Sequence, residues 1–221
     1  MAPQQQIDRL VPIISAIRAA GNRLTNFPIS IDTTSSRVAR ACLEAGADCI
    51  NDVSAGTADE EMLPLIAEKK CGIILMHRLV DPARDSYSDR YHEPPQYTDV
   101  VADVATFLKS RADAAMSAGI NPCSIIIDPG LGFGKSVEDN LRLIRGTPSL
   151  LSLGYPVLSA LSRKSFVGRV SLGQSSMPDE RLPGTLALSI MHYLAGARLF
   201  RVHDVSEHIR SLRAAEATQL D

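Results

Sequence analysis

Polar side chains lie at or just after the ends of several short apolar runs, where they could bind a small molecule. This set consists of Asp32, Asn51, His77, Asp128, Arg163, Lys164, Arg201 and His203. Carboxylate and amide oxygens accept hydrogen bonds, whereas lysine, arginine and protonated histidine bind anions. The sequence contains no apparent Ser-His-Asp or Cys-His arrangement that would indicate a covalent nucleophile. The chemistry that these side chains predict is therefore hydrogen bonding and anion binding.

Each of these side chains needs a strand to position it, and the chain alternates strand and helix patterns. Strands are expected at 29–32, 48–51, 72–77, 125–128, 156–162 and 199–202. Helices are expected at 7–20, 38–45, 59–69, 98–118, 136–145, 183–195 and 204–216. Residues 72–77 are almost continuously apolar, which is typical of a strand buried on both faces of a parallel sheet. The repeated strand–helix units predict a parallel α/β fold.

Two α/β arrangements fit this alternation, an open doubly wound sheet and a (β/α)8 barrel. No GxGxxG sequence follows the first expected strand, which disfavours a dinucleotide-binding open sheet. A single acidic residue at a strand end could simply cap a helix. Six successive strands that each carry a polar residue are hard to explain by capping, and barrel enzymes build their sites at the carboxyl ends of their strands. We therefore predict a TIM-type (β/α)8 barrel that forms a single domain over residues 1–221.

The composition excludes several classes of protein. Of the 221 residues, 45% are hydrophobic and 22% are charged, and the net charge is -2. These values are ordinary for a folded enzyme and exclude a disordered or polybasic chain. Basic stretches with interleaved aromatic residues are missing, so a nucleic-acid partner is not expected. No apolar run reaches the ~20 residues of a membrane span and no signal sequence follows Met1, so we expect a cytoplasmic location and no membrane partner.

Four cysteines are present, and none of them has CxxC spacing. They are Cys42, Cys49, Cys71 and Cys123. We expect reduced and mostly buried thiols, with a disulfide or a zinc site as the alternative. The sequence therefore predicts no metal-ligating residues.

Seven segments follow one another in the order in which one enzyme family carries its motifs. They are ISIDT at 29–33, GADCINDV at 46–53, LMH at 75–77, DPGLGFGK at 128–135, SRKSF at 162–166, GTLA at 184–187 and RVHDV at 201–205. On these motifs the chain resembles the dihydropteroate synthases over almost its whole length. The resemblance implies condensation of 6-hydroxymethyl-7,8-dihydropterin pyrophosphate with 4-aminobenzoate, which gives 7,8-dihydropteroate and pyrophosphate in folate biosynthesis.

The resemblance also implies how the flat pterin is held. A pterin presents clustered N–H donors, and Asp128 at the end of a deep strand would accept two of them in parallel. Asp32 and Asn51 would add contacts in the plane of the ring, and Met76 would line the same site. Lys164 would hydrogen-bond the pterin carbonyl and a ring nitrogen, and it is the first of three residues expected to be catalytic.

The remaining implied residues surround the other two reacting groups. Phe133, Ser162 and Arg163 are expected beside the 4-aminobenzoate. Arg201 and His203 are separated by two positions on one expected strand, so their side chains would point to the same face. With the following helix N-terminus they would bind the pyrophosphate leaving group, and they are the other two expected catalytic residues. Stabilisation of this leaving group and orientation of the arylamine would supply the acceleration.

The sequence departs from the family at its beginning. The segment Ile7–Ile14 resembles the helix that follows the family's second flexible loop, so we expect a barrel truncated at its N-terminus to about six strand–helix units. We favour an incomplete coding sequence over a fragment completed by another chain or a degenerate paralogue. The family binds Mg²⁺ through its first strand, so Mg²⁺ is an expected cofactor whose usual strand is missing. The loop at 78–82 also lacks the family's Met-x-Gly-x-Pro pattern.

Two other functions stay open beside the synthase. One is a pterin-dependent methyltransferase, because such enzymes share the barrel and the pterin-binding acids. The other is a catalytically silent pterin-binding fragment or interaction subunit, which the missing strands would favour. The SRKSF and RVHD segments point to the synthase. The resemblance further implies a homodimer formed through helices in the C-terminal half.

Overall fold

The computed structural model describes residues 1–79, 86–93 and 95–219, which form two compact units. Unit 1 consists of Met1–Met76 with Leu108–Ile126, and unit 2 consists of His77–Phe107 with Ile127–Asp221. The helix α4 (Val100–Ser117) and the strand β4 (Ile125–Asp128) contribute residues to both units. The prediction of a single domain over the whole chain stays a prediction.

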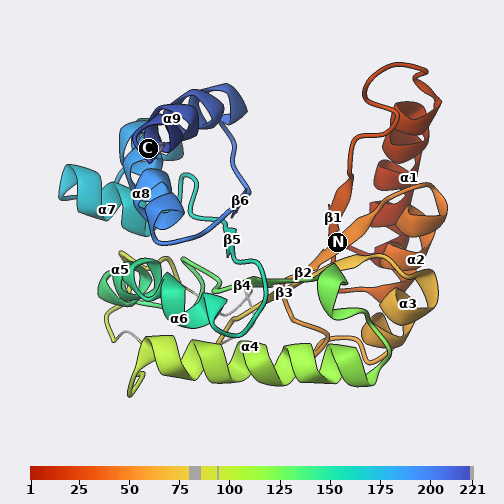
Figure 1. Ribbon diagram of the computed structural model, residues 1–221, viewed down its shortest axis with the longest axis horizontal. Coiled ribbons are helices and arrows are strands. Elements are labelled where there is room, and N and C mark those ends of the chain that lie inside the picture. The colour runs from red at the N-terminus through yellow and green to blue at the C-terminus, as the bar shows by residue number, and fades with distance from the viewer. Residues whose placement is uncertain (80–85, 94, 220–221) are drawn as a thin grey trace. The chain divides into compact units, whose positions relative to one another are not determined.

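Unit 1 repeats the strand–helix alternation that the sequence predicts. Its elements, labelled in Figure 1, are α1 (Pro3–Ala19), β1 (Ser30–Asp32), α2 (Ser36–Glu44), β2 (Cys49–Asp52), α3 (Met62–Lys69), β3 (Gly72–Met76) and the short 3-10 helix η2 (Pro122–Ser124). β2 pairs in parallel with both β1 and β3. In this register Asp32 lies beside Asn51, so the two polar residues are held as neighbours at the carboxyl ends of their strands.

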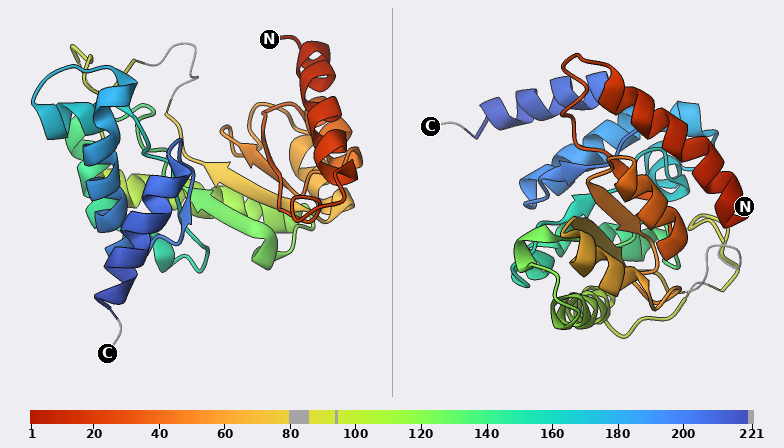
Figure 2. Two further views of the ribbon diagram at one scale, coloured as in Figure 1. Left: turned by 90° about the horizontal axis from the view of Figure 1, so that it is seen from above. Right: turned by 90° about the vertical axis from the view of Figure 1, so that its right-hand side faces the viewer.

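The core of unit 1 forms where apolar strand residues meet helix stripes. Ile50 and Ile73 are completely buried and are paired across β2 and β3. Val38 and Cys42 on α2 are four residues apart, which places them on one face of that helix, and both are completely buried. α1 packs against α2, and α2 against α3, as Figure 2 shows for the first pair.

Unit 2 continues the alternation. Its elements are α5 (Val137–Arg145), α6 (Thr147–Leu151), β5 (Leu158–Ser159), α7 (Ser165–Leu172), the 3-10 helix η3 (Pro178–Arg181), α8 (Leu182–Leu194), β6 (Leu199–Phe200) and α9 (Val205–Ala217). β5 pairs in parallel with β6, and a single parallel bridge joins Ile127 of β4 to Val157. α8 packs against α7 and α9, and the views in Figure 2 show α8 and α9 side by side.

The strand pairs establish a parallel α/β fold but not a closed barrel. β1 to β4 form one sheet in chain order, and β5 and β6 form a second. The strand pairs of the described residues close no barrel, so that part of the prediction stays open. Within the described residues no helix is long and apolar enough to cross a membrane.

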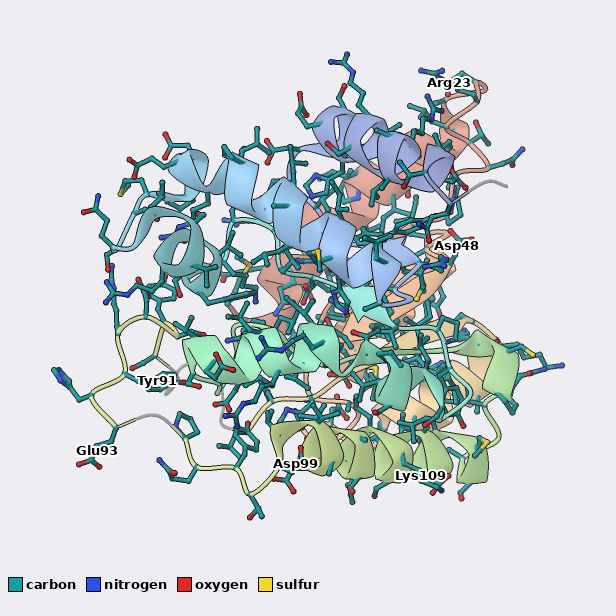
Figure 3. The ribbon with its side chains drawn as sticks, turned by 60° about the vertical axis from the view of Figure 1, so that its left-hand side comes forward. Arg23, Asp48, Tyr91, Glu93, Asp99 and Lys109 are labelled. Atoms are coloured by element: carbon teal, nitrogen blue, oxygen red, sulfur yellow. The ribbon has the colours of Figure 1, made fainter. Side chains whose placement is uncertain are left out.

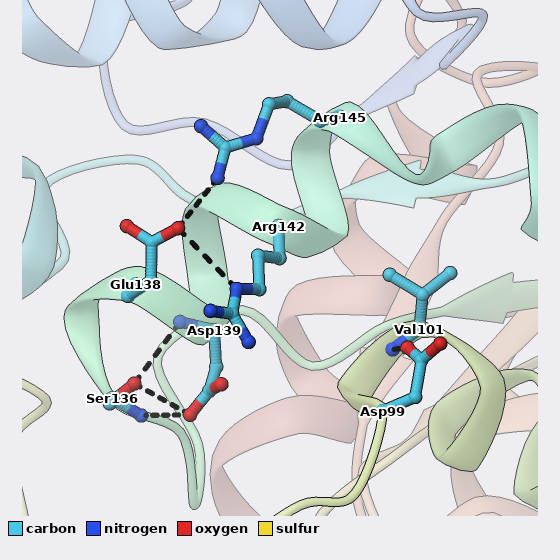
Figure 4. Close-up of polar contacts among 7 residues, drawn as sticks. All are labelled: Asp99, Val101, Ser136, Glu138, Asp139, Arg142 and Arg145. Carbon is cyan, nitrogen blue, oxygen red and sulfur yellow. Dashed lines mark hydrogen bonds and ion pairs between the residues drawn. The ribbon is translucent and has the colours of Figure 1, made fainter.

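A capping box fixes the start of α5, directly after the glycine-rich segment 130–134. The Ser136 hydroxyl accepts a hydrogen bond from the Asp139 amide at 3.1 Å, and the Asp139 carboxylate accepts from the Ser136 amide at 3.1 Å (Figure 4). Glu138 in the first turn binds Arg142 and Arg145 in the last turn. Both features stabilise the helix and place its first turn where the loop ends.

Several local predictions are wrong in detail. The strand expected at 156–162 is only Leu158–Ser159, and the strand expected at 199–202 ends at Phe200, because only these residues find partners across β5 and β6. Arg201 and His203 therefore follow the strand and do not lie on it. Residues 80–82 of the loop that departs from the family pattern lie outside the described residues.

The cysteines are also less buried than predicted. All four are free thiols, but only Cys42 is buried. Cys49 and Cys71 are partly exposed, and Cys123 is exposed because it lies in the surface turn η2. Burial of the Cys49 thiol raises its pKa to about 11, so this thiol is protonated and unreactive at neutral pH.

Candidate functional site

Unit 1 contributes a pair of polar side chains at the carboxyl ends of β1 and β2. The Asn51 side-chain N–H donates to the Asp32 carboxylate at 3.1 Å. The other atom of this amide, the Asn51 oxygen, is buried and has no hydrogen-bond partner in the described part of the chain. A buried acceptor of this kind is costly unless a donor reaches it. The Met76 side chain at the end of β3 is buried too.

Unit 2 holds the predicted pterin carboxylate, Asp128. Its side chain is only 2% exposed and accepts a hydrogen bond from the Gly130 amide at 2.7 Å. Burial raises the pKa of this carboxyl, and the Gly130 N–H and the positive charges of Lys164, Lys135 and Arg201 oppose that rise. Three cations therefore act on one buried carboxylate, which is the arrangement of a binding site more than of a helix cap.

Lys164 lies over the ring of Phe133, with its Nζ atom 3.6 Å from the ring centroid. The lysine is the N-cap of α7, and the glycine-rich segment makes room for its stem. A Cβ atom on Gly132 would lie 2.7 Å from the Lys164 Cδ, so a larger residue there would displace the lysine. The contact joins a predicted pterin ligand to a predicted arylamine contact.

A cavity of about 520 Å³ in unit 2 brings half of the ten predicted site residues together. Five of its lining residues are predicted site residues, namely Phe133, Ser162, Arg163, Lys164 and His203. Its further lining side chains, for which no role was predicted, include Tyr87, Asp89, Arg90, Met177 and Arg181. A second cavity, of about 390 Å³ in unit 1, lies beside Cys71 and Ser124 at the amino ends of β3 and β4 and contains no predicted site residue.

Arg163 is held in an unusual backbone conformation by its neighbours. Its φ is 58°, and its amide donates to the Thr185 hydroxyl at 3.1 Å. Its carbonyl accepts from the buried Arg181 guanidinium at 2.8 Å. Its own guanidinium makes two bonds to the Asp204 carboxylate, and this contact lowers the pKa of Asp204. The geometry favours a role for Arg163 in shaping the loop; its predicted contact with the arylamine stays a prediction.

Ser162 and His203 both line the cavity and contact each other directly. The Ser162 hydroxyl lies 3.0 Å from the His203 Nδ1 and also accepts from the His203 amide at 3.2 Å. Arg201 is exposed and does not line this cavity, although its amide donates to the Ser159 carbonyl at 2.9 Å and its charge reaches Asp128. The structure thus places His203 with the residues predicted to contact the arylamine, whereas the charge of Arg201 acts on Asp128.

A further buried group, Lys135, received no role from the sequence analysis and contacts His77, one of the polar residues at the strand ends. Lys135 is completely buried, and its Nζ lies 3.0 Å from the His77 Nδ1. The sequence feature that could have indicated a role for this lysine is its position, as the last residue of the DPGLGFGK segment and directly before the N-cap of α5. Because lysines are usually exposed, no local pattern in the sequence predicts that this one is buried.

Gly130 supplies a stability prediction. Its φ is +67°, and a Cβ atom there would lie 1.8 Å from the His77 carbonyl oxygen. Gly130→Ala should lower the free energy of unfolding by about 2–5 kcal/mol, from left-handed strain of ~1–2 and overpacking of ~1–3 kcal/mol. Gly173→Ala is the matched control, because Gly173 has a φ of +73° and no heavy atom within 4 Å of the added Cβ. Equal losses in urea unfolding would show that the His77 contact is unimportant.

No group of three or more His, Cys, Asp or Glu side chains is arranged to hold a metal ion in residues 1–79, 86–93 and 95–219. Mg²⁺ is commonly bound through one or two carboxylates and the phosphates of a substrate.

Comparisons with known proteins give one consistent result. Residues 1–203 match the family described as pterin binding enzyme. A dihydropteroate synthase of Mycobacterium leprae is 40% identical over 219 residues, which cover 97% of this chain and 73% of that protein. The dihydropteroate synthase of Xanthomonas albilineans solved with 4-aminobenzoic acid is 37% identical with a TM-score of 0.87, covering 99% of this chain and 76% of that one. The same enzyme in complex with 7,8-dihydropteroate is 37% identical with a TM-score of 0.86, covering 100% and 76%.

Proposed function

This chain belongs to the dihydropteroate synthases of the pterin-binding enzyme family, which act in folate biosynthesis, and we propose that its own residues carry out the family's reaction. In that reaction the amino nitrogen of 4-aminobenzoate forms a bond to the exocyclic methylene carbon of the pterin. The bond from this carbon to the pyrophosphate oxygen breaks, pyrophosphate leaves with the bonding electron pair, and the arylamine nitrogen loses a proton. The product is 7,8-dihydropteroate.

The observation that carries the proposal is the buried Asp128 carboxylate, on which three cations act and which accepts a hydrogen bond from the Gly130 amide. A pterin offers two parallel N–H donors of the kind that such a carboxylate binds. The unit 1 pair supports the same assignment, because the buried Asn51 oxygen needs a donor and Asp32 is beside it. We assign these three residues to pterin binding, together with the buried Met76 side chain.

The unit 2 cavity supports the assignments for the second substrate. Phe133 supplies an aromatic face and Ser162 supplies a hydroxyl to the same cavity, so an arylamine would find both an apolar surface and a hydrogen-bond partner there. Lys164 is near both substrates in this proposal, because it lies over Phe133 and acts on Asp128. It would donate to the pterin and hold the ring in register with the arylamine.

Departure of pyrophosphate is assigned to Arg201 and His203. Both precede α9, a helix of 13 residues whose first turn presents amide donors. Preorganised donors that meet the negative charge as it develops are a large source of acceleration. Mg²⁺ would bind together with the pyrophosphate group of the substrate and offset its negative charge. The roles assigned to Arg201 and His203 do not depend on the metal.

Three broader features are proposed from the family alone. These are completion of the parallel strands into a (β/α)8-type barrel, a homodimer, and a cytoplasmic location. Light scattering of the purified chain measures its oligomeric state directly, and a monomer at the concentration used in the assay would contradict the proposed homodimer.

The test of the proposed function is pyrophosphate release by the purified chain, with pterin pyrophosphate, 4-aminobenzoate and Mg²⁺ supplied. We expect release that depends on 4-aminobenzoate, accompanied by a product with the mass of 7,8-dihydropteroate. Release in the absence of 4-aminobenzoate would indicate simple hydrolysis, and no release would contradict the proposal for this chain.

A further inference from the structure

Lys135 is a completely buried charged residue whose hydrogen bonds the proposed reaction does not use. Its side chain has no exposed surface, and three acceptors lie close to its Nζ. They are the His77 Nδ1 at 3.0 Å, the Gly130 carbonyl at 3.0 Å and the Phe133 carbonyl at 2.8 Å. An ammonium has three N–H donors, so each of them can be matched with one of these acceptors. A buried charge is tolerated when it is hydrogen-bonded in this way.

The contact with His77 fixes the protonation state of the imidazole. An ammonium can only donate, so the His77 Nδ1 must accept and the ring proton lies on Nε2. Burial and the Lys135 charge lower the pKa of His77 to about 3, so the ring is neutral in the folded protein near neutral pH. The ring also packs edge-on against Phe107, with centroids 5.0 Å apart. His77 is therefore a fixed acceptor for the lysine.

Lys135 holds the segment 130–134 in place through hydrogen bonds to its backbone. The segment's carbonyls at Gly130 and Phe133 bind Lys135, and the Gly134 carbonyl accepts from the Tyr97 hydroxyl at 2.7 Å. The Gly132 amide donates to the Asn140 side chain at 2.6 Å. Three glycines with positive φ give this segment much conformational freedom in the unfolded chain, so ordering it requires such contacts.

We propose that Lys135, held by His77, is a positioning residue that fixes the 130–134 segment so that the Phe133 ring faces the arylamine cavity beneath Lys164. The contact of Lys164 with Phe133 at 3.6 Å depends on where this segment lies. The inference rests on the proposed function, because it assigns the Phe133 face to 4-aminobenzoate. Lys135 touches no substrate, and it acts on the arylamine side through the segment, while its charge also helps to lower the pKa of Asp128.

The first variant is Lys135→Met, which keeps the apolar stem and removes the ammonium. We expect the KM for 4-aminobenzoate to rise about tenfold, because tenfold is the loss of affinity that corresponds to one missing buried charge-assisted contact. The KM for pterin pyrophosphate should change less. Lys109→Met is the matched control, because Lys109 is 61% exposed on the outer side of α4 (Figure 3) and its ion pair with Asp113 is on the surface. Equal changes in both KM values would overturn the inference.

The second test uses His77 and remains decisive if Lys135→Met does not fold. His77→Asn places an amide oxygen near the position of Nδ1 and should recover most of the 4-aminobenzoate affinity. His77→Phe removes the acceptor and should raise that KM about as much as Lys135→Met does. If the Asn and Phe variants have the same KM, the hydrogen bond to Lys135 has no positioning role.

Amide hydrogen exchange of the 130–134 segment, measured without substrates, separates this inference from the proposed function. Lys135→Met and His77→Phe should speed exchange there severalfold, whereas Lys109→Met should not. Unchanged exchange in both site variants would overturn the inference even in an active enzyme. Wild-type protein that shows no turnover would contradict the proposed function, while faster exchange in the variants would still support the positioning of the segment.

Discussion

Asp128→Asn should lower kcat/KM for the pterin pyrophosphate by about a hundredfold to ten-thousandfold. Two charge-assisted hydrogen bonds of ~1.5–3 kcal/mol each would be lost, and each ~1.4 kcal/mol is a factor of ten in rate. The asparagine keeps the shape of the side chain but turns an NH₂ group toward one of the pterin N–H donors. Steady-state kinetics with both substrates varied measures the loss. A change of less than about threefold would contradict the assignment of Asp128 to the pterin, since ~0.7 kcal/mol is less than one hydrogen bond.

The same substitution should raise the thermal stability of the protein near neutral pH. Burial raises the pKa of the Asp128 carboxyl above its ordinary value, so the folded protein holds this proton more tightly than the unfolded chain does. Stability from this group is therefore complete below about pH 4, the ordinary pKa of aspartate, and is lost as the pH rises through the raised pKa. Asparagine has no charge to bury and loses nothing over that range.

The stability difference between Asp128→Asn and wild type should thus increase as the pH is raised from about 4 to neutral. Thermal melts across that range measure it. Asp113→Asn is the control, because the Asp113 carboxylate is 48% exposed in a surface ion pair and its loss should change the melting temperature little. An Asp128→Asn protein that is less stable than wild type at neutral pH would show that the three neighbouring cations outweigh the cost of burial.

The sequence predicted the positions of the strand-end acids because local features determine them. The apolar run at 72–76 and the Ile-Ile-Ile run before Asp128 form strands within one residue of the expected bounds. Their ends are set by the glycines and polar residues that follow, and a parallel register then places Asn51 beside Asp32. Such features are visible in a single sequence because they depend on neighbouring residues.

Contacts between distant segments could not be predicted in the same way. β6 is limited to Leu199–Phe200 by the length of its pairing with β5, so the expected strand positions of Arg201 and His203 are wrong. The burial of Lys135 depends on His77, which lies 58 residues earlier in the chain. The backbone of Arg163 is set by Arg181, Thr185 and Asp204. Tertiary contacts of this kind override the local preference of a residue.

Lys164→Ala should also lower kcat/KM about a hundredfold or more, because two hydrogen bonds from an ammonium to the pterin, at ~1.5–3 kcal/mol each, would be lost. Lys164→Arg should not restore the activity, since a planar guanidinium differs in shape from an ammonium and the lysine stem fits closely against Gly132. Lys109→Ala is the control for loss of an exposed lysine. Retention of most of the activity in Lys164→Ala would exclude a catalytic role for this residue.

The double variant Lys164→Ala with Asp128→Asn tests whether the two residues act on the same ligand. The Lys164 charge holds down the pKa of Asp128, against the effect of burial. Loss of the lysine therefore already weakens the carboxylate as an acceptor, and the second substitution has less left to remove. We expect the combined loss in kcat/KM to be at least fivefold smaller than the product of the single losses, because residues that share a network are not additive. Strict multiplication of the two losses would show that Lys164 and Asp128 work on separate steps or separate substrates.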